Sequence, residues 1–498
     1  VGTGNTDVAV TNNLSVGGSL TVGGSPVGGA ALTATASGAI SNGDTCVVNT
    51  DGSVSAVAES VVALTNTSTE YIRSSGNYTS IAYDPDLNQF IALYQYSNDL
   101  KARVVSIASN GTISEGSEKT VDTSSITYTS ISYHQGQNAY IGTWREGSNS
   151  YAIELTVSGT TISTGNAQSI GGSYASYHDS CYDPDTDQVI LVFRTNTSAG
   201  YCVCMHYTNG YLQLGNWHQF DSGVIQCSIT YDTNANRVVV SYTDTTNSNY
   251  GTVCVGTVSG QTISFGTPVV WNSEYTRDAN SNRAAIEFDP STNKVLIASA
   301  AGSSREYGKC VVATVATSGN SISFGSVTTF ATASSGYDIG SITLSYDTNN
   351  TNIGINYHDT SDYNLNCLTA TISGSSVSFT TLVEASHDYK YASAAFGTTH
   401  AILFFNGDND DLDVIGQKTA SVSTNLTSEN YIGIADAAYS NSATATIQVV
   451  GSVDDAQSSL TVGQSYYVQS DGSISTTAAD PSVFAGTAVA ATKLIVKG

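Results

Sequence analysis

Apolar and polar residues alternate in short runs along most of the chain, and the runs recur with a period of about 50 residues. Each copy has an apolar alternating run, a polar turn and a second apolar run, which is the pattern of a β-hairpin. The best-preserved turns share an aromatic residue followed by Asp and Pro: Tyr83-Asp84-Pro85, Tyr182-Asp183-Pro184 and Phe288-Asp289-Pro290. Asp and Pro favour turns through side-chain-to-backbone bonds and preset dihedral angles. The pattern therefore predicts hairpins rather than helices.

Seven copies of this hairpin can be aligned. They start at Thr79, Thr129, Ser180, Ser228, Ala285, Thr343 and Ser393, and the last copy is degraded. A third apolar run follows each hairpin, as in residues 102–109, and a fourth follows of the type QTISFG in residues 261–266. Four antiparallel strands per unit, repeated around a ring, predict an all-β fold with a seven-bladed β-propeller. The degraded copy leaves six or eight blades as alternatives.

The last copy lacks a fourth strand of its own, because the chain enters a different segment after residues 418–422. Residues 53–64, just before the first copy, resemble the fourth-strand pattern. A ring closed by a strand from the opposite end of the chain leaves no long exposed edge. The propeller is therefore predicted over residues 52–424, with residues 52–66 as its closing strand.

A second repeat lies outside these copies. GDTCVVNTDGSVSAVAES from Gly43 aligns without a gap with GQSYYVQSDGSISTTAAD from Gly463. In both, Asp-Gly between alternating strands predicts a two-residue hairpin turn. Because a closed ring brings its ends together, we predict a small flanking β domain built from both chain ends, with a hairpin at residues 32–51 and most of its mass in residues 425–498.

Residues 1–31 are short Gly-punctuated runs with too little apolar mass for a core of their own. We expect this segment to attach the chain to an assembly or to intertwine with copies of itself; a flexible linker is the alternative.

The charge balance, 16 basic against 41 acidic residues and a net charge of −25, disfavours nucleic acid as a partner, because a negative field repels phosphates. No apolar run reaches membrane-spanning length, and no signal peptide is recognisable. Three of the eight cysteines, Cys202, Cys310 and Cys367, fall in comparable columns of the third strand in different blades. Such columns are too far apart for a disulfide, so free buried thiols are favoured.

Variable loops supply the candidate binding site. In a propeller, the loops between the second and third strands and those between blades emerge on one face, and here they differ in every copy. Tyrosine, of which the chain has 30, offers flat apolar rings with hydroxyls that suit sugars or a protein partner. The predicted rim residues are Trp144, Arg145, Tyr174, Tyr177, His178, Tyr275, Arg277, Arg305, Tyr307, His358, Tyr363, Tyr389 and Tyr391.

The densest acidic run, residues 406–413, contains Asp408, Asp410, Asp411 and Asp413. Flexible carboxylate loops bind calcium, but the spacing departs from the EF-hand pattern. A solvated loop and a calcium site both remain open, and no other cofactor is indicated. No nucleophile elbow, zinc pattern or phosphate loop occurs, so we expect a binding protein rather than an enzyme.

Both chain ends resemble bacteriophage proteins. LSVGGSLTVGGSPV, residues 14–27, resembles the N-terminal attachment segments of tail-fibre and virion structural proteins, and residues 429–498 resemble the C-terminal module of marine phage (cyanophage-like) fibre proteins. The propeller is not part of this resemblance. The resemblance implies a homotrimer on the virion surface, held by other virion proteins through the N-terminal segment. Its propeller rim would bind a host-surface glycan or protein during adsorption.

Two alternatives to that function stay open. One is a structural or decoration protein of the virion that binds no host ligand. The other is a secreted, extracellular adhesin or filament subunit of a cell surface.

Overall fold

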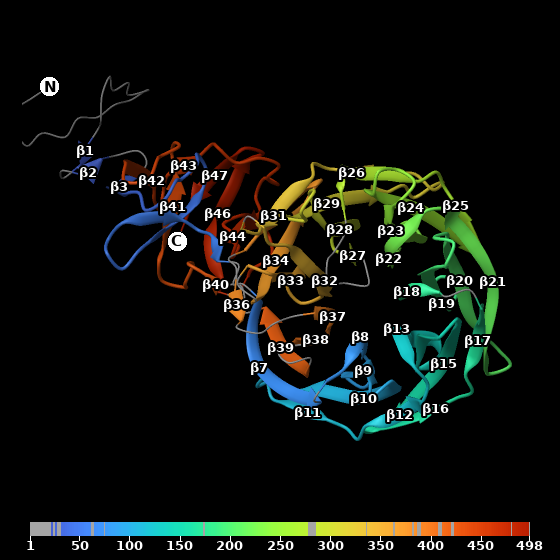
Figure 1. The fold of residues 1–498 in the computed structure, drawn as a ribbon. Coiled ribbons are helices and arrows are strands. Elements are labelled where there is room, and N and C mark those ends of the chain that lie inside the picture. Colours follow the sequence, from blue (N-terminus) through green and yellow to red (C-terminus); the bar gives the residue numbers. More distant parts are fainter. Residues whose placement is uncertain are drawn as a thin grey trace, which may run out of the picture. The chain divides into compact units, whose positions relative to one another are not determined.

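The structure is a computed structural model that describes residues 21–497, apart from 23–24, 27–30, 61–63, 74, 173–174, 277–284, 335, 362–363, 381–382, 386–389, 407–410, 420–422 and 480. Within the described ranges the regular secondary structure is β-strand apart from one short 3₁₀ helix. Seven antiparallel sheets are arranged around a central axis as the blades of a propeller (Figure 1). The predicted all-β fold and the seven blades are confirmed.

Within blades 1 to 6 the strands follow one another in chain order from the centre outward, and blade 7 departs from this order in its outermost strand. Blade 1 contains β8 (Asn77–Asp84), β9 (Gln89–Tyr96), β10 (Asp99–Ile107), β11 (Ile113–Glu115) and β12 (Lys119–Asp122); blade 2 contains β13 (Ile126–His134), β14 (Ala139–Glu146), β15 (Asn149–Ser158), β16 (Thr161–Thr164) and β17 (Gln168–Gly172); blade 3 contains β18 (Ser176–Asp183), β19 (Gln188–Arg194), β20 (Gly200–Thr208) and β21 (Tyr211–Asp221); blade 4 contains β22 (Val224–Asp232), β23 (Arg237–Asp244), β24 (Tyr250–Ser259), β25 (Thr262–Phe265) and β26 (Val269–Tyr275).

The remaining blades repeat this order. Blade 5 contains β27 (Ala285–Asp289), β28 (Lys294–Ala301), β29 (Tyr307–Val315), β30 (Ile322–Phe324) and β31 (Thr328–Thr332); blade 6 contains β32 (Ile339–Asp347), β33 (Asn352–Asp359), β34 (Asn364–Ser373), β35 (Ser376–Phe379) and β36 (Val383–Ala385); blade 7 contains β37 (Lys390–Phe396), β38 (Ala401–Asn406), β39 (Leu412–Thr419) and β7 (Leu64–Arg73). In five blades the outer strand is split into two pieces that both pair with the third strand.

Blade 7 is completed by a strand from the N-terminal side of the ring, but not by the predicted residues 53–64. The closing strand is β7, which pairs antiparallel with β39 from Leu64 opposite Thr419 to Arg73 opposite Leu412. Residues 54–56 form β5 instead and pair with β4. The predicted closing strand was about ten residues too early. Residues 54–56 are the second strand of the Asp-Gly hairpin, so they pair with its first strand, β4, and are not free to close the ring.

The aromatic-Asp turns owe their repetition to backbone capping. Asp84 accepts hydrogen bonds from the backbone N–H groups of Asp86 and Leu87 through Oδ1, at 2.8 and 3.1 Å. The same arrangement recurs at Asp183, Asp232, Asp289 and Asp347. The residue just before the second strand then has a positive φ of 49–55° in six blades; these residues are Asn88, Asn138, Asp187, Asn236, Asn293 and Thr351. Asn and Asp tolerate this conformation, which explains their place in the repeat.

The blades pack through aromatic and aliphatic side chains on both sheet faces. One aromatic position near the end of the second strand is buried in six blades; it is occupied by Tyr94, Trp144, Phe193, Tyr242, Tyr357 and Phe405. The third-strand cysteines belong to the same interior, and all eight cysteines of the chain are free thiols.

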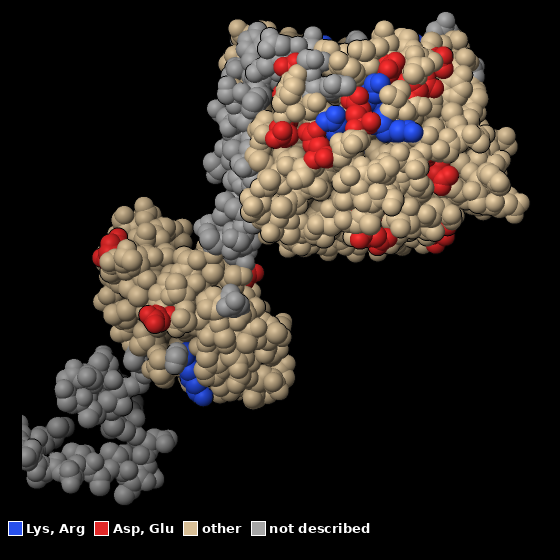
Figure 2. Space-filling view, turned by 90° about the horizontal axis from the view of Figure 1, so that it is seen from below, with Lys and Arg blue, Asp and Glu red and all other residues tan. Residues whose placement is uncertain are grey.

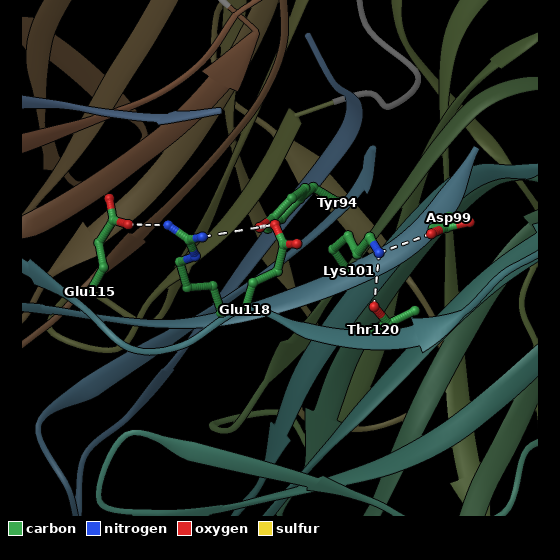
Figure 3. Close-up of polar contacts among 7 residues, drawn as sticks. Tyr94, Asp99, Lys101, Glu115, Glu118 and Thr120 are labelled. Carbon is green, nitrogen blue, oxygen red and sulfur yellow. Dashed lines mark hydrogen bonds and ion pairs between the residues drawn. The ribbon is translucent and has the colours of Figure 1, made fainter. Parts of the chain in front are cut away.

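Charged side chains are sparse on the side of the ring seen in Figure 2. On the side seen in Figure 2, Lys and Arg side chains lie among Asp and Glu side chains in one area, and most of the remaining surface carries neither. On the outer part of blade 1, Arg103 pairs with Glu115 and lies 3.8 Å from Glu118, which accepts a hydrogen bond from the Tyr94 hydroxyl (Figure 3). Lys101 contacts Asp99 at 2.9 Å. These pairs are structural, because each carboxylate is matched within its own blade.

A second compact unit comprises residues 1–61 and 421–498, and the ring comprises residues 62–420. These limits differ from the predicted 52–424 for the ring. The unit contains two five-stranded sheets. The first has the order β3 (Ala31–Thr35), β42 (Thr444–Gln448), β41 (Tyr431–Ala435), β4 (Thr45–Val48) and β5 (Val54–Ala56); the second has the order β43 (Val453–Asp454), β47 (Lys493–Val496), β46 (Val483–Ala490), β44 (Ser465–Val468) and β45 (Ile474–Ser475).

The two sheets are copies of one another. The hairpin β4–β5 corresponds to β44–β45, and each pairs with a strand that carries a glycine at the same place, Gly433 or Gly486. At either glycine a Cβ would meet a backbone oxygen of the next strand at 2.0 or 2.1 Å. In the second copy the five strands are consecutive, whereas in the first the propeller is inserted between β5 and β41. The flanking β domain is therefore a duplicated sheet.

The Asp-Gly turns are longer than predicted. Val48 pairs with Val54, so residues 49–53 form the loop, and only Gly52 has a positive φ, of 82°. Asp51 accepts a hydrogen bond from the backbone N–H of Ser53 at 2.9 Å, and Asp471 does the same with Ser473. Two short strand pairs lie outside these sheets. β1 (Thr21–Val22) pairs with β2 (Ser25–Pro26), before β3 in the sequence. β6 (Glu59–Ser60), which follows β5, pairs with β40 (Ser423–Thr424), which precedes β41.

The predicted attachment segment lies outside the described residues up to position 20. None of the helices in the described ranges is long and apolar enough to span a membrane; the single helical element is η1 (Gln135–Gln137).

Candidate functional site

The inner strands begin with a repeated backbone irregularity. In five blades, the register with the second strand shifts near the start of the inner strand, and one non-glycine residue there has a positive φ. The residues are Tyr78 (φ 51°), Tyr128 (52°), Tyr177 (59°), Gln226 (51°) and Ser341 (49°). For a bulky side chain this conformation costs about 1 kcal/mol, and such strain persists where the surroundings impose it. Bulges of this kind redirect a side chain.

In three consecutive blades the strained residue is tyrosine, and the three rings form a row. The ring centroids of Tyr78 and Tyr128 are 5.4 Å apart, and those of Tyr128 and Tyr177 are 5.3 Å apart. All three side chains are half-buried, so part of each remains in contact with solvent. Aromatic rings at these distances attract one another, which fixes the row as a unit.

Two arginines complete this row. The guanidinium carbon of Arg145 lies 5.4 Å from the Tyr128 centroid, and that of Arg194 lies 5.8 Å from the Tyr177 centroid. Each arginine sits near the end of its second strand, opposite the start of the inner strand. Arg145 donates to Ser176 Oγ at 2.9 Å, and Arg194 donates to Ser198 Oγ at 2.9 Å. Cation–π contacts of this geometry hold the guanidinium planes in place.

We call Tyr78, Tyr128, Tyr177, Arg145 and Arg194 the Tyr–Arg row. It lies at the end of the ring where the chain enters each blade and where second strands lead to third strands. This is the end predicted as the binding platform. The structure thus brings Arg145 and Tyr177 of the predicted set together, and adds Tyr78, Tyr128 and Arg194.

Three of the predicted rim residues are buried, which corrects their assignment. Trp144 is 0% exposed and stacks on Tyr151 with centroids 5.5 Å apart. It occupies the aromatic core position that recurs in six blades, so it belongs to the interior of the ring and not to the rim. His178 and His358 are each 1% exposed. His178 lies 3.2 Å from Thr143 Oγ1 and 3.4 Å from Ser150 Oγ, between blades 2 and 3.

Other predicted rim residues have local partners in blades 4 to 6. Arg305 pairs with Asp338 at 2.5 Å. Tyr307 lies under Lys309, whose ammonium is 5.2 Å from the ring centroid and pairs with Glu274. Tyr275 is half-buried at the end of β26. Tyr174, Arg277, Tyr363 and Tyr389, and the side chain of Tyr391, lie outside the described residues.

The proposed calcium loop is only partly described. Asp408 and Asp410 fall outside the described residues. Asp411 accepts a hydrogen bond from the backbone N–H of Ser75 at 3.4 Å, and Asp413 lies in β39 opposite Tyr71. Within the described ranges, no three His, Cys, Asp or Glu side chains are grouped so as to hold a metal ion.

The centre of the ring contains a cavity of about 270 Å³ lined by the inner strands of all seven blades. Two carboxylates line it, Asp179 and Glu287. Asp179 is engaged by the Ser228 hydroxyl and by the backbone N–H of Ile229, at 3.0 Å for the latter. Burial raises the pKa of Glu287 to about 8, and the charge of Asp179 acts in the same direction. Glu287 is therefore largely protonated at neutral pH.

No protein-family model and no curated protein sequence matches this chain. Among solved structures, the chain is similar to the β-propeller domain of Cps50 (Swd1) from Myceliophteria thermophila, with 8% identity over 72% of this chain and 100% of that chain and a TM-score of 0.45. It is also similar to a Bacteroides uniformis protein described as a 6-phosphogluconolactonase, with 8% identity over 61% of this chain and 85% of that chain and a TM-score of 0.43. The strand pairing of the chain itself makes it an all-β protein with a seven-bladed β-propeller.

Proposed function

We propose that this chain is a virion-surface adhesion protein whose propeller binds a host-surface glycan at the Tyr–Arg row. The role is recognition rather than catalysis. The observation that carries the proposal is the unbroken contact of three strained tyrosines across three blades, with two guanidiniums against their rings.

The chemistry of the row suits a sugar chain. Tyrosine rings present apolar faces and edges to the C–H groups of a sugar, and their hydroxyls exchange hydrogen bonds with its hydroxyls. Guanidinium groups add several donors in a fixed plane. Rings held by neighbouring rings and by cation–π contacts lose little side-chain freedom on binding, which favours affinity.

The position on the virion rests on the resemblance of residues 14–27 and 429–498 to phage proteins. The flanking β domain supports it indirectly, since strands that precede the ring in sequence and strands that follow it form one unit separate from the ring. Attachment through other virion proteins and a homotrimeric state belong to the same proposal.

The test is binding to a glycan array and to purified host envelope by Tyr128→Ala and Arg145→Ala variants. Each variant should bind at least tenfold more weakly, equivalent to about 1.4 kcal/mol or more. Tyr211→Ala is the matched control, because Tyr211 is 70% exposed on the outer strand of blade 3 and should leave binding within twofold. Thermal unfolding of each variant checks the fold. Equal binding by all variants, or no binding by the parent protein, would overturn the proposal.

A further inference from the structure

One cation of the Tyr–Arg row differs from the other cations at the same end of the ring. Three of those others are each paired with a carboxylate; the pairs are Lys101–Asp99, Lys309–Glu274 and Arg305–Asp338. Arg194, at the end of β19 in blade 3, has no carboxylate within ion-pairing distance among the described residues. The row therefore carries a positive charge that the described part of the chain does not neutralise by direct contact.

Neutral groups hold the Arg194 side chain in place. Its guanidinium carbon lies 5.8 Å from the centroid of the Tyr177 ring, and Nη2 donates to Ser198 Oγ at 2.9 Å. The side chain is half-buried, and Nη1 makes no hydrogen bond with a described residue. Unlike Nε, Nη1 is not sequestered from solvent. Arg194 thus presents a charged donor to solvent at a fixed position.

The chain has no shortage of carboxylates that could have neutralised this arginine, since 41 acidic residues face 16 basic ones. Asp179, on the inner strand of the same blade, is engaged instead by the Ser228 hydroxyl and the backbone N–H of Ile229. A guanidinium without a carboxylate partner keeps its charge and its planar set of N–H donors for a bound anion. The arrangement therefore favours a ligand that supplies the missing carboxylate.

The groups beside Arg194 indicate what carries that anion. The Tyr128 ring lies 5.3 Å from the Tyr177 ring, and its hydroxyl makes no hydrogen bond with the described residues and is not sequestered from solvent. The guanidinium carbon of Arg145 lies 5.4 Å from the Tyr128 centroid and adds a second positive charge. A sugar ring with a carboxylate substituent matches this set, because its C–H groups meet the tyrosine rings while the carboxylate meets a guanidinium.

We propose that the Tyr–Arg row selects acidic glycans. The carboxylate of a uronic-acid residue accepts from Arg194 Nη1, and the sugar ring lies against Tyr128 and Tyr177. This inference rests on the function proposed above and narrows it from glycans in general to anionic ones. The net charge of −25 repels such a ligand only weakly at physiological salt, because exposed charges are screened beyond about 8 Å, whereas the contact at Arg194 is shorter than that.

The experiment is isothermal titration calorimetry on the full chain with trisaccharides of galacturonate, glucuronate and mannuronate, each compared with its methyl ester. The ester keeps the sugar and removes only the charge. At least one acid should bind at least tenfold more tightly than its ester. Arg194→Met should reduce that acid to the affinity of its ester. Arg305→Met is the matched control, because Arg305 already has a carboxylate partner, and it should keep the tenfold preference.

Tyr128→Ala should weaken the acid and the ester alike, since contact with the ring serves both. If Arg194→Met fails to fold, as judged by its thermal transition, Arg194→Gln removes the same charge and takes its place. Equal affinity for acid and ester, a preference that survives removal of the Arg194 charge, or no binding of any of the three acids would each overturn the inference. The function proposed for the row fails separately, if no glycan, neutral or acidic, binds in a manner that depends on Tyr128.

Discussion

Glu287 makes the stability of the propeller depend on pH in a direction opposite to that of most carboxylates. Its pKa rises from 4.5 to about 8, first because the group is buried in the central cavity and second because Asp179 is nearby; the backbone N–H of Phe288 opposes the shift. The folded state therefore keeps this proton to a higher pH than the unfolded chain does. Stability from this group is full below pH 4.5 and is lost as the pH rises to about 8.

The size of the loss follows from the pKa difference. A difference of about 3.5 units at 1.36 kcal/mol per unit sets an upper limit of about 5 kcal/mol. Glu287 is only half-buried by its surface area, so the side chain keeps part of its contact with solvent. We therefore expect about 2 kcal/mol. Glu287→Gln, which stays neutral, should match the parent protein at pH 5 and exceed its free energy of unfolding by about 2 kcal/mol at pH 9.

Urea unfolding at pH 5, 7 and 9 measures this difference. Tryptophan fluorescence reports on the ring alone, because Trp144, Trp217 and Trp271, the three tryptophans of the chain, all belong to it. Asp185→Asn, which removes an exposed carboxylate from blade 3 and retains Glu287, is the control and should lose stability between pH 5 and 9 as the parent protein does. Parallel loss of stability by the parent and Glu287→Gln between pH 5 and 9 would show that the carboxylate is fully solvated and that the reasoning fails.

Two further predictions concern the turns and the split domain. Thr351 has a φ of 50° where the other blades have Asn or Asp, so Thr351→Asn should raise the free energy of unfolding by about 0.5–1 kcal/mol in urea; a decrease would contradict the role assigned to this position. Replacing residues 62–420 with a copy of the short β45–β46 connection, residues 476–482, should leave a domain that melts cooperatively. Circular dichroism and size-exclusion chromatography would show this, and an unfolded or aggregated product would mean that the ring is required for the domain to fold.

The number of blades could be predicted because a hairpin is a local object. The apolar alternation and the turn residues around Asp84 or Asp183 lie within about 20 residues of sequence, and the same signals recur in the other copies. The closing strand was misplaced because residues 53–56 fit two roles in sequence, and the hairpin register with residues 45–48 decides between them. The duplication of the whole flanking sheet was hidden, since one copy is interrupted by the entire ring.

The binding residues were harder to predict, because a side chain near a strand end is buried or exposed according to where the strand stops, and the sequence does not fix that residue. Trp144 and His178 were placed on the rim, but the buried part of β14 extends as far as Trp144, and His178 is buried beside the register shift at the start of β18. Tyr78 and Tyr128 were missed because the copies were aligned from Thr79 and Thr129, one residue later. The signal was present, as tyrosine stands at the same place in three consecutive copies.

The pairing of β7 with β39 determines how the ring bears tension. The chain enters the ring at Leu64 and leaves it at Thr419, and these two residues lie opposite each other. A pull on the ring through its polypeptide tethers therefore draws neighbouring ends of two paired strands the same way. The hydrogen bonds between β7 and β39 are then not sheared, and the pulling force is carried by the pairing of β39 with β38 and by the adjoining blades. A ring that is pulled from both of these ends is therefore expected to resist unravelling.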